Sequence, residues 1–314
     1  MKNILITGAA GFIGANLSRK ITKLKIIPHL IVHNNSNLWR INDIIPNCIL
    51  HRVDISNKRS IKQIIKKIEP DLTYHLASYG VYPNQNNFET MMVTNALGTF
   101  NLLEAIETYS ESSKFLNMGS SFEYGNKIKP IKKTDTLEPN TLYGLSKSTQ
   151  SLLVDYFAQR KKLSVVTVRI FGAYGKYESK GRLVMDILLS IIRDKKLIIN
   201  SPKSKRDFIH IDDIISCIIL ASKKRFNNEI INVGNGKEYS VKDVLDICEQ
   251  IFNTKLKISY ISKQREFDKM HGKGYANIHE TQKLLKWTPK IPLAMGLIET
   301  HNWLKENISL YDFR

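Results

Sequence analysis

The feature that most constrains the fold stands at the start of the chain, where the turn TGAAGFIG joins an apolar run to an amphipathic segment. The run KNILITG has the composition of a buried β-strand, and FIGANLSRKITKL has the periodicity of a helix with one apolar face. Gly8 permits a tight turn, Gly11 allows a phosphate to approach the backbone, and Gly14 allows the helix to pack close to the strand. This strand–turn–helix unit predicts a dinucleotide site, because the helix N-terminus offers free N–H groups to a pyrophosphate.

The same alternation of apolar runs and amphipathic segments continues through the first half of the chain. It predicts parallel β–α–β units, and therefore an α/β fold with a Rossmann-type doubly wound sheet covered on both faces. After Gly172 the segments become shorter and mixed, which predicts a smaller mixed α/β lobe. We expect an NAD(P)-binding domain over residues 1–172, with a later strand near 230–234 returning to it. Residues 173–314 are expected to form mainly a substrate-binding lobe, with the ligands in the cleft between the two halves.

Composition narrows the class of protein. The formal net charge is +18, but the lysines are scattered, so we expect a small anionic substrate and no nucleic acid partner. No apolar stretch approaches the ~18 residues of a membrane helix, and the chain opens on a strand-like run rather than a signal peptide. Cys48, Cys217 and Cys248 form no C-x-x-C pair. These features predict a cytoplasmic protein with free thiols, no metal site and no membrane association.

The end of the second predicted strand lacks the carboxylate that usually holds the ribose of NAD. The sequence there reads LIVHNNSNLWR, with His33 at the expected position. The missing negative charge favours NADP(H) over NAD, with His33, Asn34, Ser36 and Arg40 as contacts for a 2′-phosphate. The alternative for Arg40 is a solvated helix residue. Asp54, at the end of the third strand, is expected to accept a hydrogen bond from the adenine amino group.

Two residues one helical turn apart, Tyr143 and Lys147 in YGLSK, share one face of a predicted helix. A free phenol has a pKa of about 10, and a neighbouring ammonium favours the phenolate. Tyr143 is therefore a candidate to exchange a proton with a sugar hydroxyl or carbonyl. Ser120, at the end of the strand-like run KFLNMGSS, would complete the proton path and orient the substrate.

Several motifs now stand in one order along the chain: TGAAGFIG, HLAS, NALGTFNLLEA, GSSFEYG, YGLSK, VRIFGAYG, RDFIHIDD and INVGNG. In this order they resemble the extended short-chain dehydrogenases/reductases of the NAD-dependent epimerase/dehydratase family, which modify nucleotide sugars. The resemblance covers nearly the whole chain. It implies an enzyme with a nucleotide diphosphate-sugar substrate. It also implies a homodimer, packed through the predicted helices 95–109 and 143–159.

The resemblance also implies roles for individual residues. The catalytic residues would be Ser120, Tyr143 and Lys147. The cofactor would be contacted by Gly8, Gly11, Phe12, Ile13, Gly14, Asp54, Ile55, Ala77, Asn95, Tyr143 and Lys147. The substrate diphosphate would be held by Arg206 and Arg265, with Arg182 as a further candidate, and the sugar pocket would be lined by Tyr79, Tyr82, Ser121 and Phe122.

Two departures from the family pattern affect the expected chemistry. Gly172 in VRIFG replaces an asparagine that often contacts the substrate phosphate. Phe122 stands where the family's 4,6-dehydratases carry the glutamate that removes a proton next to the new ketone. Glu123 is one residue along, and on a strand a shift of one residue turns a side chain to the opposite face. We therefore expect hydride transfer without loss of water, unless this segment is an irregular loop from which Glu123 can act as the base.

The main functional prediction is reduction of the C4 ketone of a nucleotide-linked 4-keto-6-deoxyhexose, with Tyr143 as proton donor. The Tyr-rich segment HLASYGVYPNQ and the missing acid after the second strand favour it. The alternative is an NAD-dependent C4 epimerase or 4-dehydrogenase. A more distant alternative is a dinucleotide-binding protein that has lost catalysis.

Overall fold

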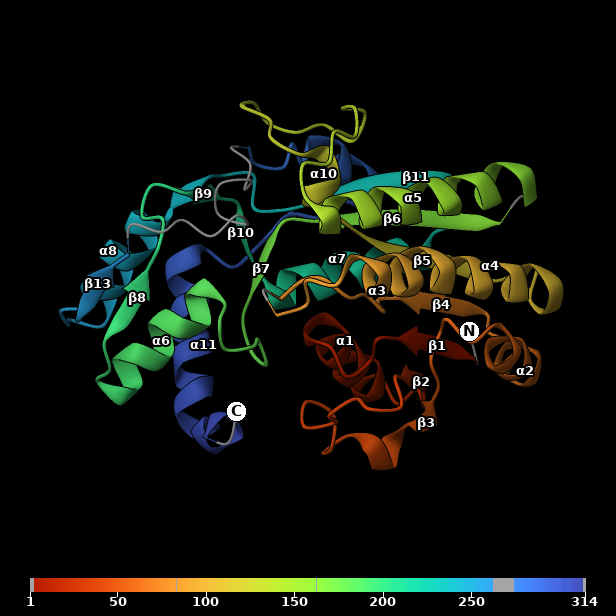
Figure 1. The fold of residues 1–314 in the computed structure, drawn as a ribbon, viewed down its shortest axis with the longest axis horizontal. Coiled ribbons are helices and arrows are strands. Elements are labelled where there is room, and N and C mark those ends of the chain that lie inside the picture. The colour runs from red at the N-terminus through yellow and green to blue at the C-terminus, as the bar shows by residue number, and fades with distance from the viewer. Residues whose placement is uncertain (1–2, 83, 162, 262–273, 313–314) are drawn as a thin grey trace.

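A computed structural model of the chain describes residues 3–82, 84–161, 163–261 and 274–312 and shows two lobes (Figure 1). The larger lobe is built on a seven-stranded sheet with the order β11-β6-β5-β4-β1-β2-β3, and every neighbouring pair is parallel. The strands are β1 (Ile4–Thr7), β2 (His29–Val32), β3 (Ile49–Arg52), β4 (Leu72–His75), β5 (Lys114–Ser120), β6 (Ser164–Ile170) and β11 (Asn227–Val233). This confirms the Rossmann-type doubly wound fold that the sequence predicts.

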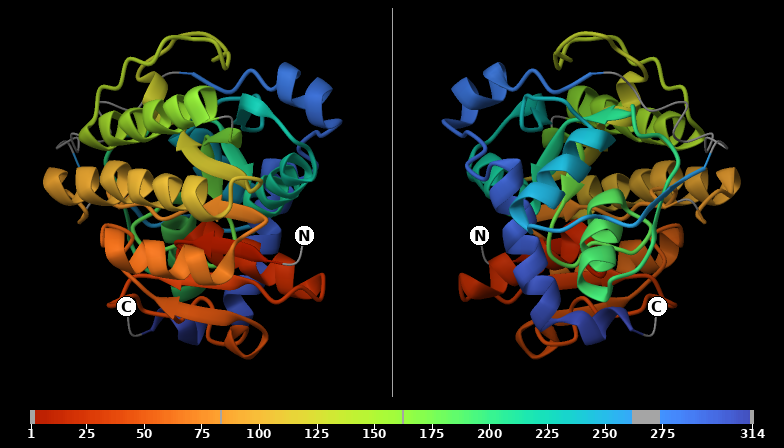
Figure 2. Two further views of the ribbon diagram at one scale, coloured as in Figure 1. Left: turned by 90° about the vertical axis from the view of Figure 1, so that its right-hand side faces the viewer. Right: turned by 90° about the vertical axis from the view of Figure 1, so that its left-hand side faces the viewer.

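Helices cover both faces of this sheet (Figure 2). On one face lie α1 (Phe12–Lys23) and α7 (Ile211–Lys223), and on the other lie α2 (Lys58–Ile68), α4 (Gly98–Tyr109) and α5 (Leu142–Lys161). The strands alternate their side chains between the two layers: Ile4 and Ile6 pack toward α1 and α7, whereas Leu5 packs toward the other layer. Because both faces are buried, the strands carry apolar side chains in succession, as the sequence of β1 shows.

The smaller lobe stands beside the carboxyl ends of the strands (Figure 1). It has its own apolar core. Its elements are α6 (Leu183–Arg193), β8 (Leu197–Ile199), β9 (Lys205–Arg206), β12 (Tyr239–Ser240), α8 (Val241–Ile251), β13 (Ile258–Tyr260) and α11 (Leu293–Glu306). A short parallel pair, β7 (Gly172–Tyr174) and β10 (Phe208–His210), connects it to the larger lobe.

The boundary between the lobes does not follow the chain at residue 172. Helix α7 packs against α1, and β11 pairs with β6, so residues 211–233 lie with the larger lobe. Helix α10 (His279–Leu285) also lies against β11. The chain therefore leaves the larger lobe after β6, builds part of the smaller one, and returns.

One predicted helix differs at its start. The sequence places it from residue 95, whereas the structure begins a helical segment at α3 (Phe88–Met92) and continues through the π-helical segment η2 (Val93–Leu97) into α4. The Asn87 side chain accepts a hydrogen bond from Thr90 N at 2.7 Å, which supplies the N-terminal cap. Over the ranges that the structure describes, no helix is long and apolar enough to cross a bilayer.

Candidate active site

The glycine turn after β1 has the shape that a bound pyrophosphate needs. Gly8 has a φ of +66°, and a Cβ there would lie 2.6 Å from Ala77 N. A Cβ on Gly14 would lie 2.3 Å from Gly8 O, so the turn and the helix can approach only without side chains. Gly11 is the N-cap of α1 and supplies no side-chain hydrogen bond to it, so the first N–H groups of the helix stay available. These residues fit the pyrophosphate of a dinucleotide.

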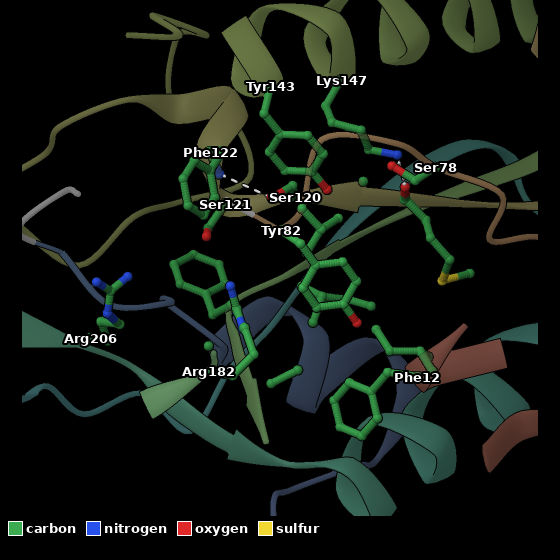
Figure 3. A pocket seen from close by; sticks show the side chains of 18 of the residues that line it. Phe12, Ser78, Tyr82, Ser120, Ser121, Phe122, Tyr143, Lys147, Arg182 and Arg206 are labelled. Atoms are coloured by element: carbon green, nitrogen blue, oxygen red, sulfur yellow. Dashed lines mark hydrogen bonds between the residues drawn. The ribbon is translucent and has the colours of Figure 1, made fainter. Parts of the chain in front are cut away.

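A cavity of about 260 Å³ extends from this turn to the smaller lobe (Figure 3). It lies at the carboxyl ends of the strands, where ligands bind in open α/β sheets. It brings together residues predicted for cofactor, catalysis and substrate that are far apart in the sequence. Those residues are Gly8, Gly11, Phe12, Ile13, Gly14, Tyr82, Ser120, Ser121, Phe122, Tyr143, Lys147, Arg182 and Arg206.

Tyr143 points from the first turn of α5 into this cavity (Figure 3). Burial raises the pKa of its phenol to about 12, while the hydroxyls of Ser78 and Ser120 favour the phenolate and so lower that pKa. Ser120 ends β5, and its Oγ accepts a hydrogen bond from Phe122 N at 3.3 Å. The site thus holds a phenol between two hydroxyls.

Lys147 lies one turn further along α5 and is only 2% exposed. Its Nζ donates to Met118 O at 2.6 Å and to Gln150 Oε1. Burial lowers the pKa of the ammonium to about 8, and attraction to the Glu123 carboxylate opposes that shift. A lysine with two fixed acceptors presents its remaining N–H in a defined direction.

The segment MGSSFEYG, residues 118–125, carries one carboxylate, that of Glu123. The prediction that Glu123 turns away assumed a strand, whereas the structure has a 3₁₀ turn, η3 (Ser121–Tyr124). Glu123 is nevertheless unavailable, because it is fully buried: its Oε2 accepts from Arg169 Nε at 2.8 Å and its Oε1 from Ser120 N at 2.7 Å. Phe122 lines the cavity instead, with its ring edge-to-face with Tyr143 at 5.6 Å.

The glycine at position 172, where the family often has an asparagine, also has a physical reason. A Cβ at this position would lie 2.6 Å from Asp207 O, because β7 and β10 run close together there. The Asp207 carboxylate is committed to backbone N–H groups, including Asn235 N at 2.7 Å and Ala276 N at 3.0 Å. Burial raises the pKa of Asp207 to about 6 against these hydrogen bonds. Asp207 therefore shapes the wall of the cavity from its buried position.

The side of the cavity toward the smaller lobe carries the candidate diphosphate ligands. Arg206 lies at the end of β9, and Arg182 is the N-cap residue of α6 (Figure 3). Glu178 lines the same wall, and burial raises the pKa of its carboxyl, although the charges of Arg182 and Arg40 oppose this. Arg265 lies outside the described residues.

The structure gives Arg40 a role different from the predicted one. Its guanidinium is buried and donates to Tyr177 O at 2.7 Å, to Ser179 Oγ and to Ala10 O. Tyr311 OH donates to the neighbouring Glu178 O at 2.8 Å. Arg40 therefore ties the loop after β2 to the smaller lobe. Because its donors are used there, it is a poor candidate for a 2′-phosphate contact.

The other residues predicted for the adenosine end lie around the ends of β2 and β3. His33 Nε2 is 3.7 Å from Asp54 Oδ2, so a carboxylate does stand near this corner, although it comes from β3. The backbone of this loop is folded, with Ser36 N donating to His33 O at 2.9 Å and Arg52 donating to Asn34 O at 2.8 Å. The structure therefore places the Asp54 carboxylate and the Arg52 guanidinium together at this corner.

Four more predicted residues are not part of the cavity lining: Tyr79, Asn95, Ala77 and Ile55. Asn95 is fully buried. Its Oδ1 accepts a hydrogen bond from Tyr79 N at 2.8 Å, and its Nδ2 donates to Tyr79 O at 2.8 Å and to Ser146 Oγ at 2.9 Å. The backbone N–H of Ala77, which lies beside Gly8, donates to Thr7 Oγ1 at 3.2 Å. Ile55 packs against Gly98. Asn95 thus shapes the Tyr79 loop rather than reaching the cavity.

Among the cavity residues that sequence reasoning missed, Ser78 and Gln85 contribute most to its geometry. Ser78 lies beside the Tyr143 phenol, and the motif HLAS, which it ends, was a usable signal because it follows a strand. Gln85 accepts hydrogen bonds from Gly80 N and Val81 N at 3.1 Å each, and so fixes the loop that carries Tyr82. Nothing in the local pattern marks Gln85, because its partners are backbone groups.

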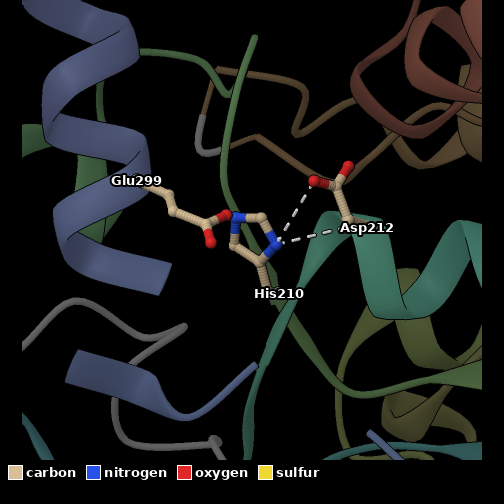
Figure 4. A group of neighbouring side chains, drawn as sticks. All are labelled: His210, Asp212 and Glu299. Carbon is tan, nitrogen blue, oxygen red and sulfur yellow. Dashed lines mark hydrogen bonds and ion pairs between the residues drawn. The ribbon is translucent and has the colours of Figure 1, made fainter. Parts of the chain in front are cut away.

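A second group of titratable side chains joins the lobes outside this cavity: His210, Asp212 and Glu299 (Figure 4). His210 is fully buried, and its Nδ1 accepts from Asp212 N at 3.4 Å at the start of α7. Burial lowers the pKa of the imidazole, while Asp212 and Glu299 oppose that shift. The group links β10 and α7 to α11 of the smaller lobe.

Comparison with known proteins places the chain among sugar-modifying enzymes. The profile of the NAD dependent epimerase/dehydratase family matches residues 4–234. A UDP-glucuronate 4-epimerase of Thermodesulfobacterium geofontis is 31% identical over 98% of this chain and 97% of its own length. A GDP-6-deoxy-D-talose 4-dehydrogenase of Aggregatibacter actinomycetemcomitans is 27% identical over 90% of each. The crystal structure of UDP-glucuronic acid 4-epimerase from Bacillus cereus with UDP-glucuronic acid and NAD matches with a TM-score of 0.86 and 25% identity, over 97% of this chain and 99% of that one.

Proposed function

This chain belongs to the NAD dependent epimerase/dehydratase family, and we propose that it is a nucleotide-sugar 4-epimerase that works with a retained NAD. The observation that carries the proposal is the meeting of Ser120, Tyr143 and Lys147 in one cavity with the glycine turn, while Glu123 is locked in a buried ion pair. Such a site is suited to moving a hydride and a proton and lacks the elimination base. The similarity to UDP-glucuronate 4-epimerases favours epimerisation over the ketone reduction that the sequence alone favours.

The proposed cofactor is NAD, which revises the sequence-based preference for NADP(H). Two observations support the change: Arg40 is committed to the smaller lobe, and the Asp54 carboxylate lies near His33. A phosphate group at this corner would meet a negative charge and no free guanidinium from Arg40. The glycine turn and the open N-terminus of α1 would hold the pyrophosphate.

Residues of the chain would transfer the proton of the C4 hydroxyl. NAD, when bound, supplies the acceptor and later the donor of a hydride. Tyr143 takes the proton from the C4 hydroxyl as the hydride leaves, and returns it when the hydride comes back on the other face of the sugar. The Lys147 ammonium stabilises the phenolate, and Ser120 orients the sugar oxygen. The apolar ring of Phe122 keeps Tyr143 in place and adds no competing base.

The proposal is tested by asking what the purified protein carries and converts. We expect denaturation to release NAD(H), and we expect UDP-glucuronate or UDP-glucose to be inverted at C4 without added cofactor. The product is resolved by chromatography against the authentic C4 epimers. A protein that purifies without a dinucleotide, and that consumes NADPH only with a 4-keto sugar nucleotide, would contradict the epimerase.

The second candidate is a C4 ketoreductase or 4-dehydrogenase. Its support is the similarity to the GDP-6-deoxy-D-talose 4-dehydrogenase and the position of Tyr82 on the cavity wall. The same assay distinguishes it, because this reaction has net oxidation or reduction and therefore consumes added cofactor in proportion to product.

We also propose a homodimer packed through α4 and α5. Large apolar side chains stand on the outer surface of these helices and of the segment before α4, among them Leu97, Leu145, Leu152 and Tyr156. Leu152 is 63% exposed and Tyr156 is 54% exposed, which is unfavourable for a helix face in water. Two such faces would bury each other in a two-fold symmetric contact.

Replacing Leu152 by glutamate is expected to convert the dimer to a monomer, because it places two charges at the apolar centre of the contact. Sedimentation velocity should give twice the 36.1 kDa chain mass for the parent protein and the single mass for the variant. Leu24→Glu, at a similarly exposed apolar residue at the end of α1, is the matched control and should leave the dimer intact. A parent protein that sediments as a monomer would contradict the proposed homodimer.

A further inference from the structure

A buried line of amide groups continues from the Lys147 ammonium away from the cavity. Lys147 Nζ donates to Gln150 Oε1, and Gln150 Nε2 donates to Asn117 Oδ1. Asn117 Nδ2 then donates to Thr167 Oγ1 at 3.3 Å on the neighbouring strand. Gln150 and Asn117 are both 0% exposed, so bulk water does not compete for these groups. A flipped Gln150 would turn its NH₂ group toward the ammonium, so only one orientation of the amide satisfies both neighbours.

Gln150 contributes to the direction of the ammonium because it lies three residues after Lys147 on α5, and residues three apart share a helix face. Together with Met118 O at 2.6 Å, its Oε1 gives Lys147 two fixed acceptors. Both acceptors are neutral oxygens. A carboxylate in the place of Gln150 would bind the ammonium more tightly but would also cancel much of its field at Tyr143.

We propose that Gln150 is a positioning residue, which fixes the Lys147 ammonium on the face of α5 that carries Tyr143 without adding a negative charge beside it. Gln150 is not part of the described cavity lining, so it acts through Lys147. The proposal rests on the proton transfer proposed for Tyr143. It does not depend on which sugar is bound or on whether the reaction is epimerisation or reduction.

Gln150→Glu is the informative variant, since it keeps the shape and adds a charge. The new carboxylate would raise the pKa of Lys147 and also that of Tyr143, by reducing the positive field on the phenol. We expect both limbs of the kcat–pH profile to move up by about one pH unit, and kcat at pH 7 to fall about tenfold and recover at higher pH. The titratable groups that interact with Lys147 are Glu123 in η3 and His75 at the end of β4. Tyr143, one turn earlier on α5, interacts with Glu123 and Arg182. None of these groups is changed in the variant.

Two further variants separate positioning from folding. Gln150→Met removes the acceptor but keeps the length, and is expected to lower kcat about tenfold at every pH. Gln159→Glu makes the same chemical change at the exposed end of α5 and should leave the profile unchanged. Should Gln150→Glu fail to fold, Asn117→Asp adds the charge one hydrogen bond further away, and a smaller shift in the same direction is expected.

A direct titration completes the test. The ultraviolet absorbance of the Tyr143 phenolate, taken as the difference between the parent protein and Tyr143→Phe, should rise at a higher pH in Gln150→Glu. A folded Gln150→Glu with an unshifted profile and an unshifted titration would overturn the proposal, as would an equal loss of kcat at all pH values. If the parent protein converts no nucleotide sugar, the proposed function fails, while the phenolate titration still decides the role of Gln150.

Discussion

Tyr143→Phe is expected to lower kcat by about 10²–10⁴-fold while leaving the fold and the bound dinucleotide in place. The variant removes only the hydroxyl that would carry the proton. The ring remains, and with it the edge-to-face contact with Phe122 at 5.6 Å. Thermal unfolding and the dinucleotide content should therefore match those of the parent protein. Turnover is measured with the nucleotide sugar that the parent protein converts best.

The matched control is Tyr260→Phe, which removes a phenolic hydroxyl from an exposed side chain of β13 in the smaller lobe. It should leave kcat within a factor of about two, since a surface substitution of this kind changes little. Full turnover by Tyr143→Phe would show that another group carries the proton. Ser120 would then be the residue to test next, because it lies beside the phenol.

Glu123→Gln is expected to destabilise the protein by about 3–5 kcal/mol, because it leaves the Arg169 guanidinium buried without a charged partner. The ion pair is 2.8 Å long, with Arg169 4% exposed and Glu123 fully buried, and Ser151 Oγ donates to the same carboxylate at 2.7 Å. In the variant, an NH₂ group would face donors on at least one side. Urea unfolding gives the free energy, and kcat per folded molecule should change only a few-fold.

This outcome distinguishes a structural carboxylate from an elimination base. A base would lose most turnover in Glu123→Gln and keep its stability, which is the reverse of the expected result. Asp246→Asn is the matched control, since its partner Lys242 lies at 2.6 Å on the surface of α8. Removing that exposed pair should cost no more than about 0.5 kcal/mol.

The sequence predicts the parts of the site that depend on local geometry. The spacing of Gly8, Gly11 and Gly14 follows from backbone sterics, and the structure has the turn between β1 and α1. The spacing of Tyr143 and Lys147 follows from the helical repeat, and both side chains line one cavity. Their catalytic role stays a prediction until the substitutions are measured.

The parts that the sequence does not reveal depend on partners that are distant along the chain. Arg40 is held by residues more than 130 positions later, and Glu123 meets Arg169 across 46 positions. A local pattern does not report such partners, so Arg40 resembles a free cation and Glu123 a free acid. The prediction for Glu123 rested on strand alternation, whereas the structure has a 3₁₀ turn here and holds Glu123 in a buried ion pair. That Glu123 takes no part in elimination stays a prediction.

The late return of β11 has a consequence for how the chain can be divided. A fragment ending at residue 172 would lack both β11 and α7, so the long strand β6 would present an unpaired edge and an uncovered apolar face. Exposed edges of this kind recruit other strands, which leads to aggregation. A fragment of residues 1–172 is therefore expected to aggregate rather than to fold on its own. Because the smaller lobe comes from segments on both sides of β11, evolution could not replace it by exchanging one C-terminal segment. It would have to change the loops within the lobe.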